Sequence, residues 1–351
     1  MSELLANHTT LRIGGPAKNF VVATTETEII TAVATADEQG ESVLILSGGS
    51  NMLVADEEID ATVVQIVSKG VDAVVSKGAS AIVDVQAGEV WDEFVAFALN
   101  RRWIGVAALS GIPGLVGAAP VQNIGAYGQE VADTISQVRT WDRESRSIRT
   151  FGVTECGFGY RDSVFKRTLL SDMPQKGARY VVLAVQFQFQ LGDFEPAVRY
   201  VELANALGVL VGEQAAGTAV REQVLALRCA KGMVATADDH DSWSAGSFFT
   251  NPVIPAEVAG TLPLGAPRFL QPDGTVKTSA AWLIEHAGFE KGFRLPASPA
   301  ALSRKHVLAL TNRGGASAAD VLALARVIRD GVRSAYGITL IPEPLLVGLS
   351  L

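Results

Sequence analysis

Two glycine-rich segments carry the clearest chemical signal in the sequence. The first is Gly48-Gly49-Ser50-Asn51, and the second runs from 110 to 117 with the sequence SGIPGLVG. Glycine allows backbone N–H groups to converge on an anion because no Cβ stands in the way, and Ser and Asn side chains add hydrogen bonds to phosphate or ribitol oxygens. Either segment alone would be interpreted as a tight turn. The pair, followed by the polar run PVQNIGAYG at 120–128, favours a site that binds a dinucleotide.

Several common catalytic signatures are absent from the sequence. It has no GxxxxGK[ST], no GxGxxG after a predicted strand, no GxSxG and no HExxH, and its four histidines are dispersed. P-loop NTPases, Rossmann dehydrogenases, α/β-hydrolases and zinc proteases are therefore disfavoured, and no metal site is predicted. The two cysteines, Cys156 and Cys229, do not form a CxxC pattern, which argues against a disulfide framework or a zinc knuckle.

The composition is typical of a globular protein with more than one domain. At about 150 residues per domain, 351 residues predict two or three domains. The net charge of −8, without blocks of Lys and Arg, argues against a surface for nucleic acid or anionic membranes. The N-terminus lacks a basic start followed by an apolar run, and the most apolar stretch, 105–121, is broken by Gly and Pro. We therefore expect a cytoplasmic protein without a membrane-spanning segment.

Regular elements are predicted on both sides of the first glycine segment. A strand at 18–23 precedes a helix that begins after Thr25, where Thr25 and Glu28 form a capping-box pattern, and that ends at Gly40. The apolar run 43–46 predicts a buried strand that leads directly into the glycines. This order of strand, helix, strand and loop places a possible phosphate site at the end of a strand.

The rest of the chain is predicted to form a β-rich first part and a more helical second part, divided near residue 205. In the first part, the patterns predict a meander within 61–90, a helix at 91–102 and an alternating strand at 180–190. In the second part, they predict a mobile stretch at 235–244, a helix at 277–287, a helix capped by Ser317 and a final strand within 338–347.

Seven segments in a fixed order give a more specific signal: LRIGGPA, ILSGGSN, LSGIPGLVGAAPVQNIGAYGQE, CGFGYRDSVFK, AGSFFTNP, KTSAAWLIEHAGF and IPEPLLVG. Through them the chain, from Asn7 to Gly348, resembles the UDP-N-acetylenolpyruvoylglucosamine reductases, in the subtype with a tyrosine-bearing substrate loop. The resemblance implies an α+β fold with a two-part FAD-binding domain of the vanillyl-alcohol-oxidase type at 1–205, divided into subdomains at about 1–68 and 69–205. It also implies a C-terminal α+β substrate-binding domain at 206–351, whose last strand returns to the active site.

The reaction and its partners are also implied by the resemblance. NADPH reduces noncovalently bound FAD, and the flavin N5 hydride adds to C3 of UDP-N-acetylglucosamine enolpyruvate. C2 then takes a proton, which gives UDP-N-acetylmuramate for peptidoglycan synthesis. The charge that builds at C2 and at the attached carboxylate requires cationic or hydrogen-bonding groups and a proton donor. No nucleic-acid or membrane partner is implied, and we expect a monomer.

Three residues match the catalytic positions of the family. Arg161 in GYRDS would bind the carboxylate, Ser247 in AGSFF would donate the proton to C2, and Glu343 in IPEP would polarise the carboxylate with a raised pKa. Each has an alternative interpretation from the residues alone. Arg161 could pair with Asp162, Ser247 could cap a helix or a turn, and Glu343 could be a solvated terminal carboxylate.

Further residues are assigned to ligand binding by the resemblance. Those placed at FAD are Gly48, Gly49, Ser50, Asn51, Ser110, Gly111, Pro113, Gly114, Gly117, Gln122, Asn123, Gly125, Ala126 and Tyr127. Those placed at the substrate are Tyr160, Tyr200, Lys231, Asn251 and Lys277. Lys231 would hold the diphosphate, and Tyr200 would lie on the loop that closes over the nucleotide. A tyrosine of the core or a lysine of the surface is the alternative interpretation for these side chains.

Two other functions stay open on the sequence. A flavin oxidase on the same scaffold would use O₂ and would need no NADPH. A non-catalytic flavin- or nucleotide-binding protein would need none of the three catalytic residues. The presence of Arg161, Ser247 and Glu343 in their family contexts argues against both.

Overall fold

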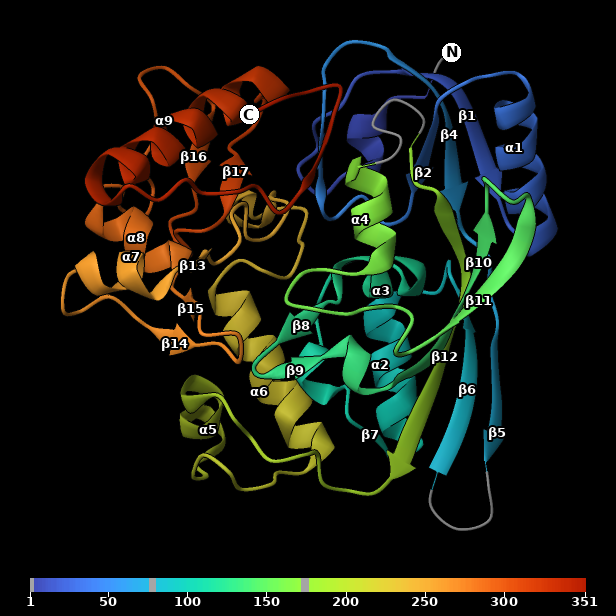
Figure 1. Ribbon diagram of the computed structural model, residues 1–351, viewed down its shortest axis with the longest axis horizontal. Coiled ribbons are helices and arrows are strands. Elements are labelled where there is room, and N and C mark those ends of the chain that lie inside the picture. Colours follow the sequence, from blue (N-terminus) through green and yellow to red (C-terminus); the bar gives the residue numbers. More distant parts are fainter. Residues whose placement is uncertain (1–2, 76–79, 172–176) are drawn as a thin grey trace. The chain divides into compact units, whose positions relative to one another are not determined.

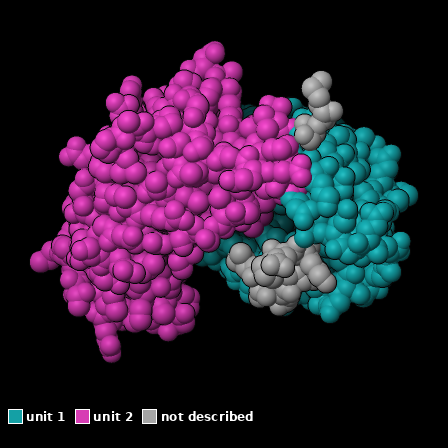
Figure 2. Space-filling view, turned by 90° about the horizontal axis from the view of Figure 1, so that it is seen from above, with its two compact units in different colours: residues 1–3, 17–48, 60–229 teal, residues 4–16, 49–59, 230–351 magenta. Residues whose placement is uncertain are grey.

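The chain forms two units whose segments alternate along the sequence. The computed structural model describes residues 3–75, 80–171 and 177–351. Unit 1 comprises residues 1–3, 17–48 and 60–229, and unit 2 comprises residues 4–16, 49–59 and 230–351 (Figure 2). The N-terminal part of the chain thus contributes two short segments to the unit that contains the C-terminus.

A small sheet and one helix form the first part of unit 1. Strands β1 (Ala17–Ala23), β4 (Ile59–Ile66) and β2 (Val43–Leu46) are adjacent in that order, and β2 pairs with β4 in parallel. Helix α1 (Glu26–Glu38) packs on this sheet through Ile29, Val33 and Ala36 (Figure 1). The three predicted elements are confirmed.

The start of α1 differs in one detail from a capping box. The Thr25 hydroxyl accepts the Glu28 N–H at 3.2 Å, as predicted. The Glu28 carboxylate, however, accepts the backbone N–H and the hydroxyl of Thr24, each at 2.7 Å, instead of the N–H of Thr25. The hydroxyl of Thr24 and its N–H lower the pKa of Glu28.

The larger sheet of unit 1 supplies most of its core. Its strands follow the order β11 (Ser147–Gly152), β10 (Ile135–Asp142), β12 (Tyr180–Leu191), β6 (Ser80–Gln86) and β5 (Val71–Val75), and β7 (Trp103–Ile104) pairs with the end of β12. Helix α2 (Trp91–Asn100) packs against it, with the rings of Phe94 and Phe187 4.9 Å apart. Strand β12 alternates as predicted from Gln186 onward, whereas its first half is buried on both faces.

Smaller elements of unit 1 surround this sheet. They are α3 (Ala119–Gln122), β8 (Gly125–Ala126), β9 (Gln129–Glu130), α4 (Val164–Ser171), α5 (Val201–Leu207) and α6 (Gly217–Ala230). Val220 and Val224 of α6 are buried in a cluster with Ala107, Ala108 and Leu203. This packing assigns α6 to unit 1, so the division between the units lies after Cys229 and not near residue 205.

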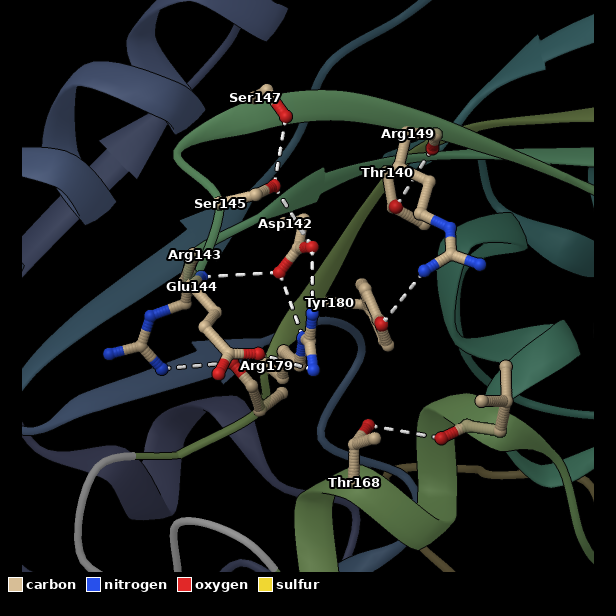
Figure 3. A network of polar contacts seen from close by, with 12 residues as sticks. Thr140, Asp142, Arg143, Glu144, Ser145, Ser147, Arg149, Thr168, Arg179 and Tyr180 are labelled. Atoms are coloured by element: carbon tan, nitrogen blue, oxygen red, sulfur yellow. Dashed lines mark hydrogen bonds and ion pairs between the residues drawn. The ribbon is translucent and has the colours of Figure 1, made fainter.

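A polar network ties the β10–β11 hairpin to neighbouring segments of unit 1 (Figure 3). Asp142 accepts two hydrogen bonds from Arg179, at 2.9 and 3.0 Å, and one from the hydroxyl of Ser145. Burial acts to raise the pKa of Asp142, but these hydrogen bonds outweigh it and the pKa is lowered. The buried Arg143 forms an ion pair with Asp37 of α1 at 2.6 Å, which joins the hairpin to the helix.

Unit 2 combines a small three-stranded sheet and short strand pairs with three α-helices. β3 (Met52–Val54) pairs in parallel with β18 (Leu345–Val347), which confirms the predicted terminal strand. The remaining elements are β13 (Val253–Ile254), α7 (Ala256–Thr261), β14 (Phe269–Leu270), β15 (Val276–Lys277), α8 (Ala280–His286), β16 (Ala300–Leu302), β17 (Leu310–Asn312) and α9 (Ala318–Tyr336). Ser317 caps α9 as predicted, and its hydroxyl accepts the Asp320 N–H at 3.1 Å.

Two sequence predictions in unit 2 can be compared with the structure, and the first of them is wrong. The helix expected at 277–287 begins at Ala280, because residues 276–277 form β15 and the hydroxyl of Ser279 caps the helix. The stretch 235–244, expected to be mobile, contains Asp241, which is buried and forms an ion pair with Arg313 at 2.7 Å. Asp241 also accepts the backbone N–H of Arg304 at 2.8 Å.

Candidate active site

The two predicted glycine segments meet in unit 1. A Cβ on Gly48 would lie 2.8 Å from the Cα of Gly114, and one on Gly117 would lie 2.6 Å from the Cβ of Ala87. Gly114 also has a φ of 120°, which favours glycine. A side chain at Gly48 would therefore force the two backbones apart. Gly48 and Gly114, which the sequence singled out as ligand contacts, are needed for this close backbone approach.

The rest of the first glycine segment belongs to unit 2. Gly49 has a φ of 56°, and a Cβ there would lie 1.8 Å from the carbonyl oxygen of His8. The amide of Asn51 donates to the carbonyl oxygen of Glu343 at 3.4 Å. This contact brings a predicted cofactor residue next to a predicted catalytic residue.

Polar groups at the start of the second segment are used within the protein. The hydroxyl of Ser110 donates to the carbonyl oxygen of Ala107 at 2.7 Å, and the N–H of Gly111 donates to a carboxylate oxygen of Asp92 at 2.6 Å. Arg221 of α6 holds Asp92 with two hydrogen bonds, at 2.6 and 2.8 Å. Burial raises the pKa of Asp92, but Arg221 and the Gly111 N–H outweigh it and the pKa is lowered. The N–H of Gly111, a residue predicted to bind FAD, is thus engaged by an internal carboxylate.

The PVQNIGAYG run turns around Asn123. This residue is fully buried with a φ of 43°, and its amide nitrogen donates to Glu130 at 2.8 Å and to the carbonyl oxygen of Gly159 at 2.9 Å. Its side-chain oxygen accepts the N–H of Ala132 at 3.2 Å. The amide of Asn123 thus stabilises the turn, and the side-chain oxygen of Gln122 accepts a hydrogen bond from Lys166 at 3.1 Å.

Arg161 is bound to the same run. Its guanidinium donates to the carbonyl oxygens of Asn123 at 3.3 Å and Gly125 at 2.8 Å, and it lies 5.5 Å from the ring centre of Tyr160. Asp162, the partner that the alternative interpretation gives to Arg161, forms an ion pair with Arg167. A φ of 53° sets the backbone of Arg161 in a conformation that is uncommon for this residue type.

Two predicted binding tyrosines contact each other in unit 1. The rings of Tyr127 and Tyr200 meet edge to face, 5.7 Å apart. Tyr200 is 51% exposed, so it is not a tyrosine of the core. Burial raises the pKa of Tyr127 to about 12. The structure therefore brings a residue assigned to FAD beside a residue assigned to the substrate.

Ser247 and Glu343 lie on two paired segments of unit 2. The N–H of Glu343 donates to the carbonyl oxygen of Phe248 at 2.9 Å, and Phe249 forms a bridge with Pro342. Ser247 precedes this pairing and is half-buried. Within the described part of the chain its hydroxyl makes no hydrogen bond, so Ser247 does not act as a helix cap.

The remaining predicted substrate residues also lie in unit 2. The side-chain oxygen of Asn251 accepts the N–H of Ala280 at 2.9 Å, which places Asn251 at the start of α8. Lys277 is in β15, opposite Val253 of β13. Lys231 directly follows α6 and is half-buried. Arg161, Tyr160 and Tyr200 belong to unit 1, whereas Asn251, Lys277 and Lys231 belong to unit 2.

Three polar residues that support these segments were not predicted from the sequence. They are Asp92, which binds Gly111 of the second glycine segment, Lys166, which binds Gln122 of the PVQNIGAYG run, and Glu195, which binds Gly105 and Gln129 beside these segments. Lys166 was within a recognised motif, GYRDSVFK, and could have been found there. Asp92 and Glu195 carry no local signal, because their partners lie 19 and 90 residues away in the chain.

Comparison with known proteins identifies two family models within the chain. Residues 17–150 match the FAD binding domain, and residues 238–347 match the C-terminal domain of UDP-N-acetylenolpyruvoylglucosamine reductase. The UDP-N-acetylenolpyruvoylglucosamine reductase of Cutibacterium acnes is 54% identical over 348 residues, which cover 99% of this chain and 90% of the relative. The enzyme of that name from Thermobifida fusca is 45% identical, with 99% and 97% covered.

A solved structure shares the fold. The crystal structure of UDP-N-acetylenolpyruvylglucosamine reductase from Thermus caldophilus matches with a TM-score of 0.65 at 23% identity, over 99% of this chain and 98% of that one. The predicted fold class, an FAD-binding domain followed by a C-terminal α+β domain, is confirmed. Among the helices that the structure describes, none has both the length and the apolar character of a membrane span.

Proposed function

Because the chain belongs to the UDP-N-acetylenolpyruvoylglucosamine reductase family, we propose that it reduces UDP-N-acetylglucosamine enolpyruvate to UDP-N-acetylmuramate, with NADPH as the reductant and FAD as the cofactor. The observation that carries this proposal is 54% identity over 99% of the chain. The product is a precursor of peptidoglycan. We further propose that the protein acts as a cytoplasmic monomer and that it belongs to the subtype with a tyrosine-bearing loop.

The residues around the first glycine segment of unit 1 fit a bound dinucleotide. Ser47, directly before Gly48, has a buried hydroxyl without a hydrogen-bond partner among the residues described. A phosphate or ribitol oxygen would satisfy it, and burying a hydroxyl without a partner is costly. The contact between Gly48 and Gly114 keeps Cβ atoms away from this place. FAD, when bound, supplies the hydride that adds to the enolpyruvyl carbon C3.

The chain's own residues would stabilise the negative charge at C2 and its carboxylate and would supply the proton to C2. Arg161, whose guanidinium is already oriented by the carbonyl oxygens of Asn123 and Gly125, would bind the substrate carboxylate. Glu343 would hydrogen-bond to the same carboxylate. Ser247 would donate the proton to C2, and its hydroxyl is not engaged by the described residues of the protein.

The nucleotide part of the substrate would be held by the other residues of the predicted site. Lys231 would bind the diphosphate, and Tyr160, Asn251 and Lys277 would contribute further contacts. Tyr200 would cover the nucleotide, which is consistent with its half-exposed ring on the segment before α5. Truncation of Lys231 to Ala should weaken substrate binding and leave the FAD content unchanged.

The proposal is tested by anaerobic stopped-flow absorbance on the purified protein. We expect NADPH to bleach the flavin band and UDP-N-acetylglucosamine enolpyruvate to restore it. Recovery only after air is admitted would favour a flavin oxidase. A colourless protein that cannot be reconstituted with FAD would favour a non-catalytic binding protein, and either result would overturn the proposal.

A further inference from the structure

Glu195 is a buried carboxylate that the proposed reaction does not use. Its residue is 1% exposed, and it lies five positions before Tyr200 in the segment that follows β12. Carboxylates are seldom buried without a cationic partner, because desolvation disfavours their charged form. In the described part of the chain no ion pair involves Glu195. Burial raises its pKa, which the hydrogen bonds from Gln129 and Gly105 lower to a smaller extent.

One oxygen of this carboxyl group joins two segments of the candidate site. Oε2 accepts the backbone N–H of Gly105 at 2.9 Å and the side-chain amide of Gln129 at 3.1 Å. Gln129 also accepts the N–H of Ala108 through its side-chain oxygen at 3.1 Å. Residues 105–108 lead into the second glycine segment, and Gln129 is the second residue after Tyr127.

The backbone of Glu195 contacts the approach to α6, and its second oxygen lies near the first residue of that helix. The N–H of Glu195 donates to the carbonyl oxygen of Ala215 at 2.9 Å. A Cβ on Gly217, the first residue of α6, would lie 3.4 Å from Oε1. This oxygen is buried and has no hydrogen-bond partner among the described residues. Helix α6 in turn bears Arg221, which holds the Asp92 carboxylate on the N–H of Gly111.

We propose that Glu195 is a positioning residue for substrate binding, because it fixes the 105–108 segment, the hairpin at Gln129 and the Tyr200 segment in one arrangement. In that arrangement the rings of Tyr127 and Tyr200 meet. Without the carboxyl group, the amide of Gln129 and the N–H of Gly105 lose a shared acceptor, and the Tyr200 segment loses its side-chain anchor. The inference rests on the proposed function, because that function identifies the substrate. The contacts of Glu195 within the protein are independent of it.

The test compares Glu195→Ala and Glu195→Gln in the full-length protein loaded with FAD. The Gln variant keeps an oxygen that can accept from Gly105 and Gln129, and the Ala variant does not. For Glu195→Ala we expect KM for UDP-N-acetylglucosamine enolpyruvate to rise about tenfold or more, because two donors lose a buried hydrogen-bond acceptor. The kcat should stay within about threefold of wild type. Glu195→Gln should restore most of the KM. Glu222→Gln, an exposed carboxyl group on α6, is the matched control and should behave as wild type.

A second measurement does not depend on activity. Amide hydrogen exchange of the substrate-free protein should be faster at 105–108 and 195–200 in Glu195→Ala than in wild type, and unchanged in Glu222→Gln. If Glu195→Ala does not fold, Gln129→Met removes the donor and keeps the carboxyl group, and the same direction of change is expected.

The outcomes separate this inference from the proposed function. A wild-type protein that does not turn over the substrate refutes the function, while the exchange experiment still tests the contacts. A wild-type protein that is active, with an unchanged KM in Glu195→Ala or in the Gln129→Met substitute, overturns the inference. The inference is also overturned if, in Glu195→Ala, kcat and the FAD content fall by as large a factor as KM rises and Glu195→Gln does not restore them. Such a result would indicate a general loss of structure.

Discussion

Ser247 is proposed to act only in the second half of the reaction, which makes its role separable. In Ser247→Ala, reduction of the flavin by NADPH should stay near normal, because this step needs no proton at C2. Reoxidation by the enolpyruvyl substrate should slow by about 10²- to 10⁴-fold, the usual contribution of a positioned proton donor. Anaerobic stopped-flow traces of the two half-reactions measure both rates.

The control for this variant is Ser350→Ala, which removes an exposed hydroxyl from unit 2. It should leave both half-reactions unchanged. An equal loss in both half-reactions of Ser247→Ala would refute the assignment of Ser247 as the proton donor.

Glu195 gives a prediction for stability that is independent of catalysis. Burial raises its pKa above the ordinary value of 4.5, so the folded protein retains this proton to a higher pH than the unfolded chain does. The stabilisation that comes with the protonated group is complete below the ordinary pKa and is lost as the pH rises through the raised pKa. Glu195→Gln is neutral throughout and should not show this loss.

Urea unfolding at a series of pH values measures this effect. The urea concentration at the unfolding midpoint of the wild-type protein should fall, relative to that of Glu195→Gln, as the pH increases above about 4.5. Above the raised pKa the difference between the two midpoints should become constant. If the difference between the urea midpoints of the two proteins does not vary with pH, Glu195 ionises as an exposed carboxyl group does.

At the scale of elements, the contact between the two glycine segments should control FAD binding. In Gly48→Ala, the new Cβ would lie 2.8 Å from the Cα of Gly114, a backbone atom that cannot turn away. The loops must separate, and we expect the Kd for FAD to rise about tenfold or more, because a shift of the backbone disturbs the hydroxyl of Ser47 and its neighbours. Titration of FAD into apo protein, followed by flavin fluorescence, measures the Kd.

Gly260→Ala is the matched control for this substitution. Gly260 lies in α7, its Cβ would have no neighbour within 4 Å, and its φ is not in the left-handed region. Its FAD affinity should equal that of wild type. The same affinity in Gly48→Ala would mean that the contact of the two loops is not part of the flavin site.

Elements that depend on local signals were predicted from the sequence, whereas features that depend on distant partners were not. Helix α1 was predicted correctly because its signals, the Thr25 cap and the apolar spacing of Ile29 and Val33, are local. The start of α8 was wrong because residues 276–277 pair with β13, and local propensity does not contain such pairing. The glycine segments were found by composition, whereas Asp92 and Glu195 were not, since they act on backbone groups distant in sequence.

At the scale of the whole molecule, the chain does not divide into two consecutive domains. The sequence predicted a contiguous C-terminal domain at 206–351, but unit 2 also contains residues 4–16 and 49–59. These segments provide β3, the parallel partner of β18, and place Leu11, Ile13 and Leu53 in the core of unit 2. A core built from three stretches of chain cannot be completed by the last stretch alone.

A fragment that contains only residues 230–351 should therefore not fold. It would lack three fully or almost fully buried side chains of its core and would expose the edge of β18, so we expect aggregation or a circular dichroism spectrum of an unfolded chain. The matched control is the full-length protein cut by a protease at a site inserted between Cys229 and Ala230, which keeps every segment of unit 2. This nicked protein should stay folded and its two pieces should remain associated in size-exclusion chromatography, because residues 4–16 and 49–59 stay packed in unit 2. A well-folded, monomeric 230–351 fragment would show instead that these N-terminal segments are dispensable for the fold of the unit.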